Sequence, residues 1–121
     1  MHKPATALLL TALLALAVLL GGCGEDAPPA AARTAALAPT DPALAKVYDS
    51  SCKLCHANPA SGAPQTGDAN AWQPRVAQGS DSLLDHSING FKGMPPMGLC
   101  MQCSEEQFLA LISFMSGQSV Q

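Results

Sequence analysis

One short run near the middle of the chain combines residue types that bind porphyrins and metals. Cys52 and Cys55 are separated by two residues, and His56 follows at once. If residues 41–56 are helical, both thiols and the imidazole lie on one helix face. The thiols could then add to the two vinyl groups of one haem while the imidazole binds its iron. The pattern is typical of covalent c-type haem attachment; a redox dithiol, half of a zinc site and a chance pair are the alternatives.

The residues before this run predict a helix that would carry it. Thr40 or Asp41 can serve as the N-cap, and Pro42 suits the first helical position. Apolar side chains then follow helical spacing up to the two cysteines, at Leu44, Val47, Tyr48, Cys52 and Cys55. We therefore expect the haem cysteines to continue the buried face of a first helix.

Helical periodicity is absent from residues 57–79, which contain three prolines and three glycines. A loop of this length is uncommon in a compact domain unless it is functional, and we expect it to pass around the edge of the porphyrin. Trp72, the only tryptophan, could pack on the haem, and Arg75 could pair with a propionate. The alternatives are a small-core anchor for Trp72 and a solvated surface position for Arg75.

A second helix is predicted over residues 80–88. Ser80 can cap it, Asn89-Gly90 can end it, and three apolar side chains share one face, at Leu83, Leu84 and Ile88. His86 lies on this helix and could be a second iron ligand. A single histidine on such a helix is more often a packing or surface residue.

A methionine loop follows the second helix. Two prolines, Pro95 and Pro96, stiffen its backbone and disfavour helix at Met94. A thioether on a rigid loop is a good soft sixth ligand, and Met/His ligation raises the reduction potential of a haem. Met94 or Met97 could serve, and core filling is the alternative for each.

The first 22 residues resemble an export signal. Lys3 precedes an apolar stretch over residues 5–20 that is short for a bilayer span. Leu20-Gly21-Gly22-Cys23 then resembles a bacterial lipobox, in which Cys23 would be lipidated. Ordinary secretory cleavage and an uncleaved anchor are the alternatives. Residues 23–39 are rich in Ala and Pro, which predicts a flexible tether or a short Ala-rich helix.

A second pair of cysteines, Cys100 and Cys103, is followed by Ser104 rather than a histidine and so lacks a proximal ligand for another haem. Forty-four residues separate the two pairs, whereas zinc ribbons typically use about 15–20. Export favours oxidation, so we predict a Cys100–Cys103 disulfide that locks the turn before the last helix. A redox dithiol is the alternative, although no βαβ pattern accompanies it.

The last helix has clear signals at both ends. Ser104 and Gln107 form a capping box, and Gly117 ends the pattern. Five apolar residues follow helical spacing between them, at Phe108, Leu109, Leu111, Ile112 and Met115. We expect this helix to cross the first one and close the core.

Composition limits the classes of function. The chain has 121 residues and a net charge of -3, which allows one small domain. Removal of residues 1–22, which carry one Lys and no acid, would leave a net charge of −4. A strongly basic patch is absent, so nucleic acid is not an expected partner.

Together these motifs resemble the monohaem class I cytochromes c, and in particular the small bacterial cytochrome c(5) subgroup. The resemblance covers residues 40–119. It rests on Cys-x-x-Cys-His at 52–56, Gly-Ala-Pro at 62–64, Gly-Asp at 67–68, Ala-Trp-Gln-Pro-Arg at 71–75, Gly-Met-Pro-Pro at 93–96 and Cys-Met-Gln-Cys-Ser-Glu-Glu at 100–106.

The resemblance implies an all-α fold of three to four helices wrapped around one covalent haem c. It implies His56 and Met94 as axial ligands, and a Pro64 carbonyl that accepts a hydrogen bond from the proximal histidine. The Cys100–Cys103 pair matches a disulfide of the family. The family often has Lys after Met-Pro-Pro, where this chain has Met97, so a second thioether lies near the ligand loop and a positive charge is missing.

We therefore predict an electron carrier rather than an enzyme, with residues 1–22 as signal, 23–39 as tether and 40–119 as cytochrome domain. Its partners would be redox proteins, such as cytochrome complexes, an oxidase or a reductase, with no small-molecule substrate. It would work in the bacterial periplasm, held at a membrane by a lipid on Cys23. The alternatives are a dedicated donor component of a terminal oxidase or periplasmic reductase, and a haem sensor or peroxidase with an open sixth site. A domain this small buries little surface alone, so we expect the haem-free protein to be largely unfolded.

Overall fold

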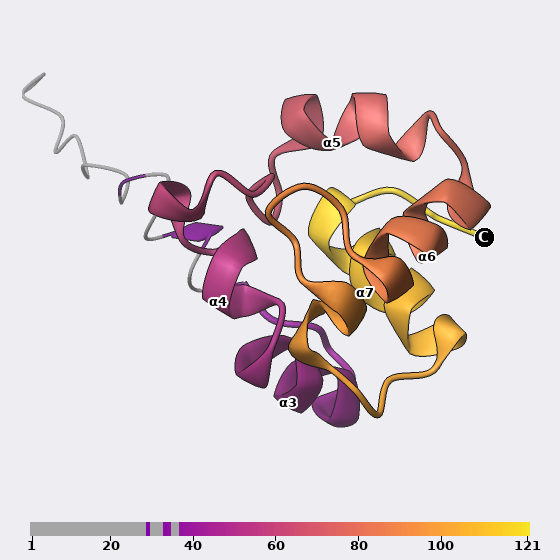
Figure 1. The fold of residues 1–121 in the computed structure, drawn as a ribbon. Helices are drawn as coiled ribbons and strands as arrows, with labels where there is room; N and C mark the ends of the chain where they lie inside the picture. Colours follow the sequence, from indigo (N-terminus) through magenta and orange to yellow (C-terminus); the bar gives the residue numbers. More distant parts are fainter. Residues whose placement is uncertain (1–28, 30–32, 35–36) are drawn as a thin grey trace, which may run out of the picture.

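The computed structural model describes residue 29, residues 33–34 and residues 37–121. The export signal, Cys23 and most of the tether lie outside the described residues. Between residues 37 and 121 the chain is helical, and its only β-type pairing is an isolated bridge between Phe91 and Met94 (Figure 1). The elements in chain order are α3 (Pro42–Ser50), α4 (Lys53–His56), η2 (Pro59–Ser61), α5 (Ala69–Val76), α6 (Ser80–Asn89), η3 (Pro96–Leu99) and α7 (Glu105–Ser116).

The prediction of an all-α fold is confirmed, with five α-helices in the described part of the chain. No helix there is both long and apolar enough to cross a membrane. Helix α3 begins as the sequence predicts. The carboxylate of Asp41 accepts a hydrogen bond of 2.8 Å from the backbone N–H of Leu44, and Pro42 occupies the first turn.

The apolar spacing predicts one continuous helix over residues 41–56, and this expectation is wrong. Helix α3 ends at Ser50, and α4 is a separate single turn. Ser51 leaves the helical region, with φ −134° and ψ −79°. Its backbone N–H and its hydroxyl both donate to the Val47 carbonyl, at 3.1 and 2.6 Å, which closes the last turn of α3. The haem-binding run is therefore presented from its own short turn.

Residues 57–79 are not one long loop, so that expectation is wrong in part. Helix α5 lies within them, and the Asp68 carboxylate caps it by accepting a 3.1 Å hydrogen bond from the N–H of Ala71. The helix has eight residues and contains Pro74. Two turns are too few to establish a repeating apolar face, so periodicity cannot detect them. The Asp68 cap was the one local signal.

Helix α6 confirms the second predicted helix, with one correction at its start. The N-cap is Gly79, at φ +89°, and Ser80 is the first helical residue. No side chain makes a capping hydrogen bond at this end of α6. Gly90 follows the last residue of the helix, as the Asn-Gly pair predicts.

Helix α7 has the predicted capping box. The Ser104 hydroxyl accepts a 3.2 Å hydrogen bond from the N–H of Gln107, and the side-chain carbonyl of Gln107 accepts one of 3.0 Å from the N–H of Ser104. Gly117 adopts the left-handed conformation at the C-cap. Both ends of the helix therefore lie where the sequence places them.

The core forms around α7. This helix lies among α3, α5 and α6 and contacts all three (Figure 1). On α3, the buried ring of Tyr48 packs edge-on against Phe114 of α7, with ring centroids 5.0 Å apart. The main cluster of buried side chains is Tyr48, Trp72, Leu83, Leu111, Ile112, Met115 and Val120, and a second consists of Cys100, Cys103 and Phe108.

Candidate haem site

A cavity of about 250 Å³ lies between α4, the methionine loop and the inner face of α7. It gathers side chains that are far apart in the sequence. With the exception of Met97, the residues singled out from the sequence as candidate haem contacts all line it, namely Cys52, Cys55, His56, Pro64, Trp72, Arg75, His86 and Met94. The chain therefore brings two thiols, an imidazole and a thioether to one largely apolar cavity, a set that matches the donors required by haem c.

His56 is buried, with 7% of its surface exposed, and its Nδ1 lies 2.8 Å from the carbonyl oxygen of Pro64. A ring nitrogen that donates to a carbonyl leaves the Nε2 lone pair available to a metal. Burial lowers the pKa of His56 below its ordinary value of 6.5; the hydrogen bond to Pro64 opposes this shift, and the charge of Arg75 adds to it. The neutral imidazole, which is the form that binds iron, is therefore favoured.

The Trp72 ring lies against the imidazole of His56. The ring centroids are 5.5 Å apart and the planes differ by 26°, which is a stacked arrangement. The indole N–H donates to the carbonyl oxygen of Gln65 at 2.9 Å. Trp72 thus lines the cavity and supports the histidine, and its only polar hydrogen is already used by the backbone.

Arg75 lines the same cavity from α5. One of its terminal nitrogens donates to the carbonyl oxygen of Ala71 in the preceding turn. Within residues 37–121 no carboxylate forms an ion pair with it. A guanidinium has five N–H donors, so several remain for an anionic group at the cavity.

The two methionines of the loop have different surroundings. Met94 lines the cavity, and its backbone makes two hydrogen bonds with the backbone of Phe91, of 2.9 and 3.0 Å. Met97 is absent from the lining and packs instead against the cluster of Cys100, Cys103 and Phe108. The two thioethers therefore have different environments, and of the two only Met94, the ligand that the family resemblance implies, lines the cavity.

His86 also lines the cavity, from α6. Its ring stacks on Phe91, with centroids 3.8 Å apart and planes 20° apart. This packing is the common role for a single histidine on such a helix, as the sequence suggested.

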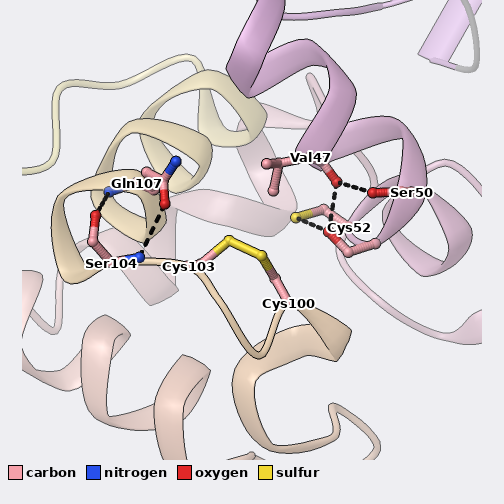
Figure 2. Close-up of a disulfide and its surroundings, with 8 residues drawn as sticks. Val47, Ser50, Cys52, Cys100, Cys103, Ser104 and Gln107 are labelled. Carbon is pink, nitrogen blue, oxygen red and sulfur yellow. Dashed lines mark hydrogen bonds between the residues drawn. A yellow bond between two sulfur atoms is a disulfide. The ribbon is translucent and has the colours of Figure 1, made fainter.

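The second pair of cysteines forms a disulfide between Cys100 and Cys103. Figure 2 shows this bond between the end of α3 and the capped start of α7. Both residues are buried, at 1% and 8% exposure, and Val47 of α3 packs against their cluster. Neither Cys52 nor Cys55 takes part in a disulfide, so both sulfur atoms are available for thioether bonds. In the described ranges no three His, Cys, Asp or Glu side chains converge on a point that could hold a metal ion.

Two contributors to the site were missed in the sequence. Thr66 is almost fully buried and is joined to Tyr48 by a hydrogen bond of 2.9 Å. Gly98 lines the cavity beside the methyl group of Met94. Thr66 lies in a stretch without periodicity, and Gly98 resembles any turn glycine, so neither carries a local signal.

The chain matches known proteins over this same region. The family model described as cytochrome C oxidase, cbb3-type, subunit III, matches residues 39–115. Cytochrome c-555 of Chlorobaculum tepidum is 42% identical over 76 residues, which are 60% of this chain and 70% of that protein. Cytochrome c5 of Azotobacter vinelandii is 41% identical over 68 residues, which are 54% of this chain and 82% of that protein.

A solved structure agrees with these sequence matches. The cytochrome in a crystal structure of an electron transfer complex of nitrite reductase with cytochrome c is 40% identical, with a TM-score of 0.55. The match covers 64% of this chain and 94% of that chain. The chain therefore belongs to the cytochrome c family.

Its fold is the all-α class I type, and the protein transfers electrons through covalently bound haem c. The Cys-x-x-Cys-His run at residues 52–56 is consistent with that mode of attachment. Cytochromes c of this kind are typically exported to the periplasm.

Proposed function

We propose that this chain is a lipid-anchored periplasmic carrier of single electrons, in which His56 and Met94 are the axial ligands of one haem. The observation that carries the proposal is that both side chains line one cavity, whereas Met97 packs elsewhere. Cys52 and Cys55 would hold the haem through thioethers. When bound, the haem supplies a reversible one-electron change at its iron.

The chain's own residues would prepare the site for that change. Pro64 fixes the tautomer of His56, and Trp72 holds the ring by stacking. A stiff loop holds Met94 through its two hydrogen bonds with Phe91. Since both ligand side chains are positioned by the fold, little rearrangement would accompany a change of charge at the iron. Arg75, with no carboxylate partner between residues 37 and 121, is suited to pair with a propionate.

The oxidised absorption spectrum tests the ligand assignment. A Met-to-iron charge-transfer band is expected in the wild-type holoprotein. Met94→Ala should abolish the band, and the matched variant Met97→Ala should leave it. The opposite result would assign Met97 as the ligand. Absence of the band from the wild type, with ready binding of carbon monoxide, would instead support a sensor or peroxidase with an open sixth site.

A dedicated donor to one redox complex is the second candidate. It is supported by the family model, described as a subunit of a cbb3-type oxidase, and by the structural relative found in a complex with nitrite reductase. The rates at which purified oxidase and nitrite reductase oxidise the reduced protein distinguish a general carrier from a dedicated donor. A general carrier should react with both enzymes at comparable rates. A dedicated donor should co-purify with one complex and react with it far faster.

We further propose that residues 1–22 are a signal, residues 23–39 a tether and residues 40–119 the cytochrome domain. The match over residues 39–115 supports the domain boundary. The intact mass of the mature protein would report the haem, the lipid on Cys23 and the state of the Cys100–Cys103 pair together. Cys23→Ala should release the protein from the membrane fraction while the haem spectrum stays unchanged. Retention of that variant in the membrane after residues 1–22 have been removed, as checked by its intact mass, would contradict lipid anchoring.

A further inference from the structure

Four successive residues that follow His56 in the chain, residues 64–67, each bond to a different helix. We call residues 64–67 the proximal segment. The Pro64 carbonyl accepts from His56 Nδ1 of α4 at 2.8 Å, and the Gln65 carbonyl accepts from Trp72 Nε1 of α5 at 2.9 Å. The Thr66 hydroxyl bonds to the Tyr48 hydroxyl of α3 at 2.9 Å. The Gly67 N–H donates to the Met115 carbonyl of α7 at 2.8 Å.

The bond between Tyr48 and Thr66 is the most buried of these. The two residues are 1% and 2% exposed, so water cannot replace either partner. Thr66 also donates its backbone N–H to the carbonyl oxygen of His56 at 2.7 Å. Displacement of Thr66 would therefore move the backbone that leads to Pro64 and would disturb the backbone of His56 itself.

Trp72 supports the same segment from a second side. Its N–H holds the Gln65 carbonyl, one residue from Pro64, and its ring stacks on His56. The carbonyl that accepts from His56 is thus fixed between two independent anchors, one on α3 and one on α5. Neither anchor makes a hydrogen bond with the Nδ1 nitrogen, which bonds to the Pro64 carbonyl.

We propose that Tyr48, Thr66 and Trp72 are positioning residues that hold the Pro64 carbonyl on His56 Nδ1 and thereby set the reduction potential of the haem. The inference rests on the proposed ligation by His56. A well-aligned bond from Nδ1 raises the basicity of the imidazole as a ligand. A more basic ligand stabilises ferric iron over ferrous iron, so loosening the proximal segment raises the potential.

The test compares four variants of the holoprotein, Tyr48→Phe, Thr66→Val, their double variant and Trp72→Phe. The midpoint potential is measured by titration, and the exchange rate of the His56 Nδ1 proton is measured by NMR in the ferrous protein. Each single variant should raise the potential and accelerate exchange. The double variant should shift the potential no further than the larger single shift, because both substitutions remove one shared hydrogen bond. Additive shifts would overturn the role of that bond.

Two controls separate positioning from a general loss of stability. Thr66→Ser keeps the hydroxyl and should retain the wild-type potential. Ser113→Ala removes a hydroxyl that bonds to the backbone of Val120, at 3.0 and 3.4 Å, and Ser113 does not line the haem cavity. It should lower stability without moving the potential. An equal shift in Ser113→Ala, or no shift in Thr66→Val, would overturn the inference.

Trp72→Phe keeps a six-membered aromatic ring at this position and loses the N–H together with the five-membered ring of the indole. It therefore remains informative if Thr66→Val does not assemble, and an unchanged potential in this variant would overturn the role of Trp72. The outcome for ligation is separate. A wild-type spectrum without His/Met features contradicts the proposed function, whereas a normal spectrum with unshifted variants contradicts only the positioning role.

Discussion

The methyl carbon of Met94 lies 3.0 Å from the point that a Cβ atom on Gly98 would occupy. This separation is tighter than nine in ten contacts of real Cβ atoms, so a side chain at Gly98 would displace the methyl group by a few tenths of an ångström. Gly98 also has a positive φ of +54°, which suits glycine. The absence of a side chain at this position therefore gives the thioether its place beside the cavity.

Gly98→Ala is expected to push the Met94 methyl aside and to weaken or shift the Met-to-iron charge-transfer band. Gly117→Ala is the matched control, because Gly117 has φ +68° and no neighbour within 4 Å of its would-be Cβ. Both variants should lose about 1 kcal/mol of stability from the positive φ. Only Gly98→Ala should change the spectrum. Identical spectra from the two variants would show that Gly98 does not position Met94.

The capping box of α7 predicts a measurable loss of stability. Ser104→Ala removes the oxygen that accepts from Gln107 N–H and should lower the free energy of unfolding by about 1 kcal/mol in a denaturant titration. Ser80→Ala is the control, since Ser80 makes no capping bond at the start of α6, and it should change stability by less than about 0.5 kcal/mol. Equal losses of unfolding free energy in the two variants would contradict a specific capping role for Ser104.

Removal of the haem should unfold most of the domain. Core residues Leu111 and Met115 line the haem cavity, so an empty site would leave much of the core without packing partners. The double variant Cys52→Ala/Cys55→Ala, exported without covalent haem, is expected to lose most of its helical signal in far-ultraviolet circular dichroism. Met97→Ala, which keeps both thiols, should retain haem and helicity. A haem-free protein with full helical signal would refute this expectation.

Burial raises the pKa of Tyr48 above its ordinary value of 10.0, and the hydrogen bond to Thr66 partly opposes the shift. As the pH rises above 10, the unfolded chain releases the phenolic proton while the folded chain retains it. The folded state then binds more protons, so its stability falls as the pH rises through this range. The loss should be absent below pH 10.

Unfolding titrations of wild type and Tyr48→Phe, from neutral pH to above pH 10, measure this effect. The variant should lose less stability at alkaline pH, because Tyr48 is the only tyrosine in the chain. Parallel curves for the two proteins would rule out Tyr48 as the source of the alkaline loss.

The parts of the fold that sequence predicts are those with local chemical signals. Asp41 with Pro42 and Ser104 with Gln107 are caps whose partners lie within one turn, so their geometry follows from the sequence alone. The break at Ser51 is equally local, but the bond from its hydroxyl to the preceding turn is one that a serine also makes within a helix. Apolar spacing alone therefore favoured a continuous helix.

The parts that sequence does not predict depend on contacts between distant segments. Met94 and Met97 have the same chemistry and lie three residues apart. The family resemblance implies Met94 as the ligand, but the packing of Met97 on the Cys100–Cys103 cluster is visible only in the folded chain. Thr66 lies in a stretch without apolar periodicity. Its hydrogen bond to Tyr48 joins two segments that are far apart in the sequence. Such pairings arise from the arrangement of helices in space, which no local pattern encodes.

The proximal segment has a consequence for which changes in length the chain can tolerate. Because residues 64–67 meet four helices in strict succession, insertion of one residue there would shift every following partner by one place. The distance along the chain from His56 to Gly67 is thus fixed, and we expect insertions to be rejected there.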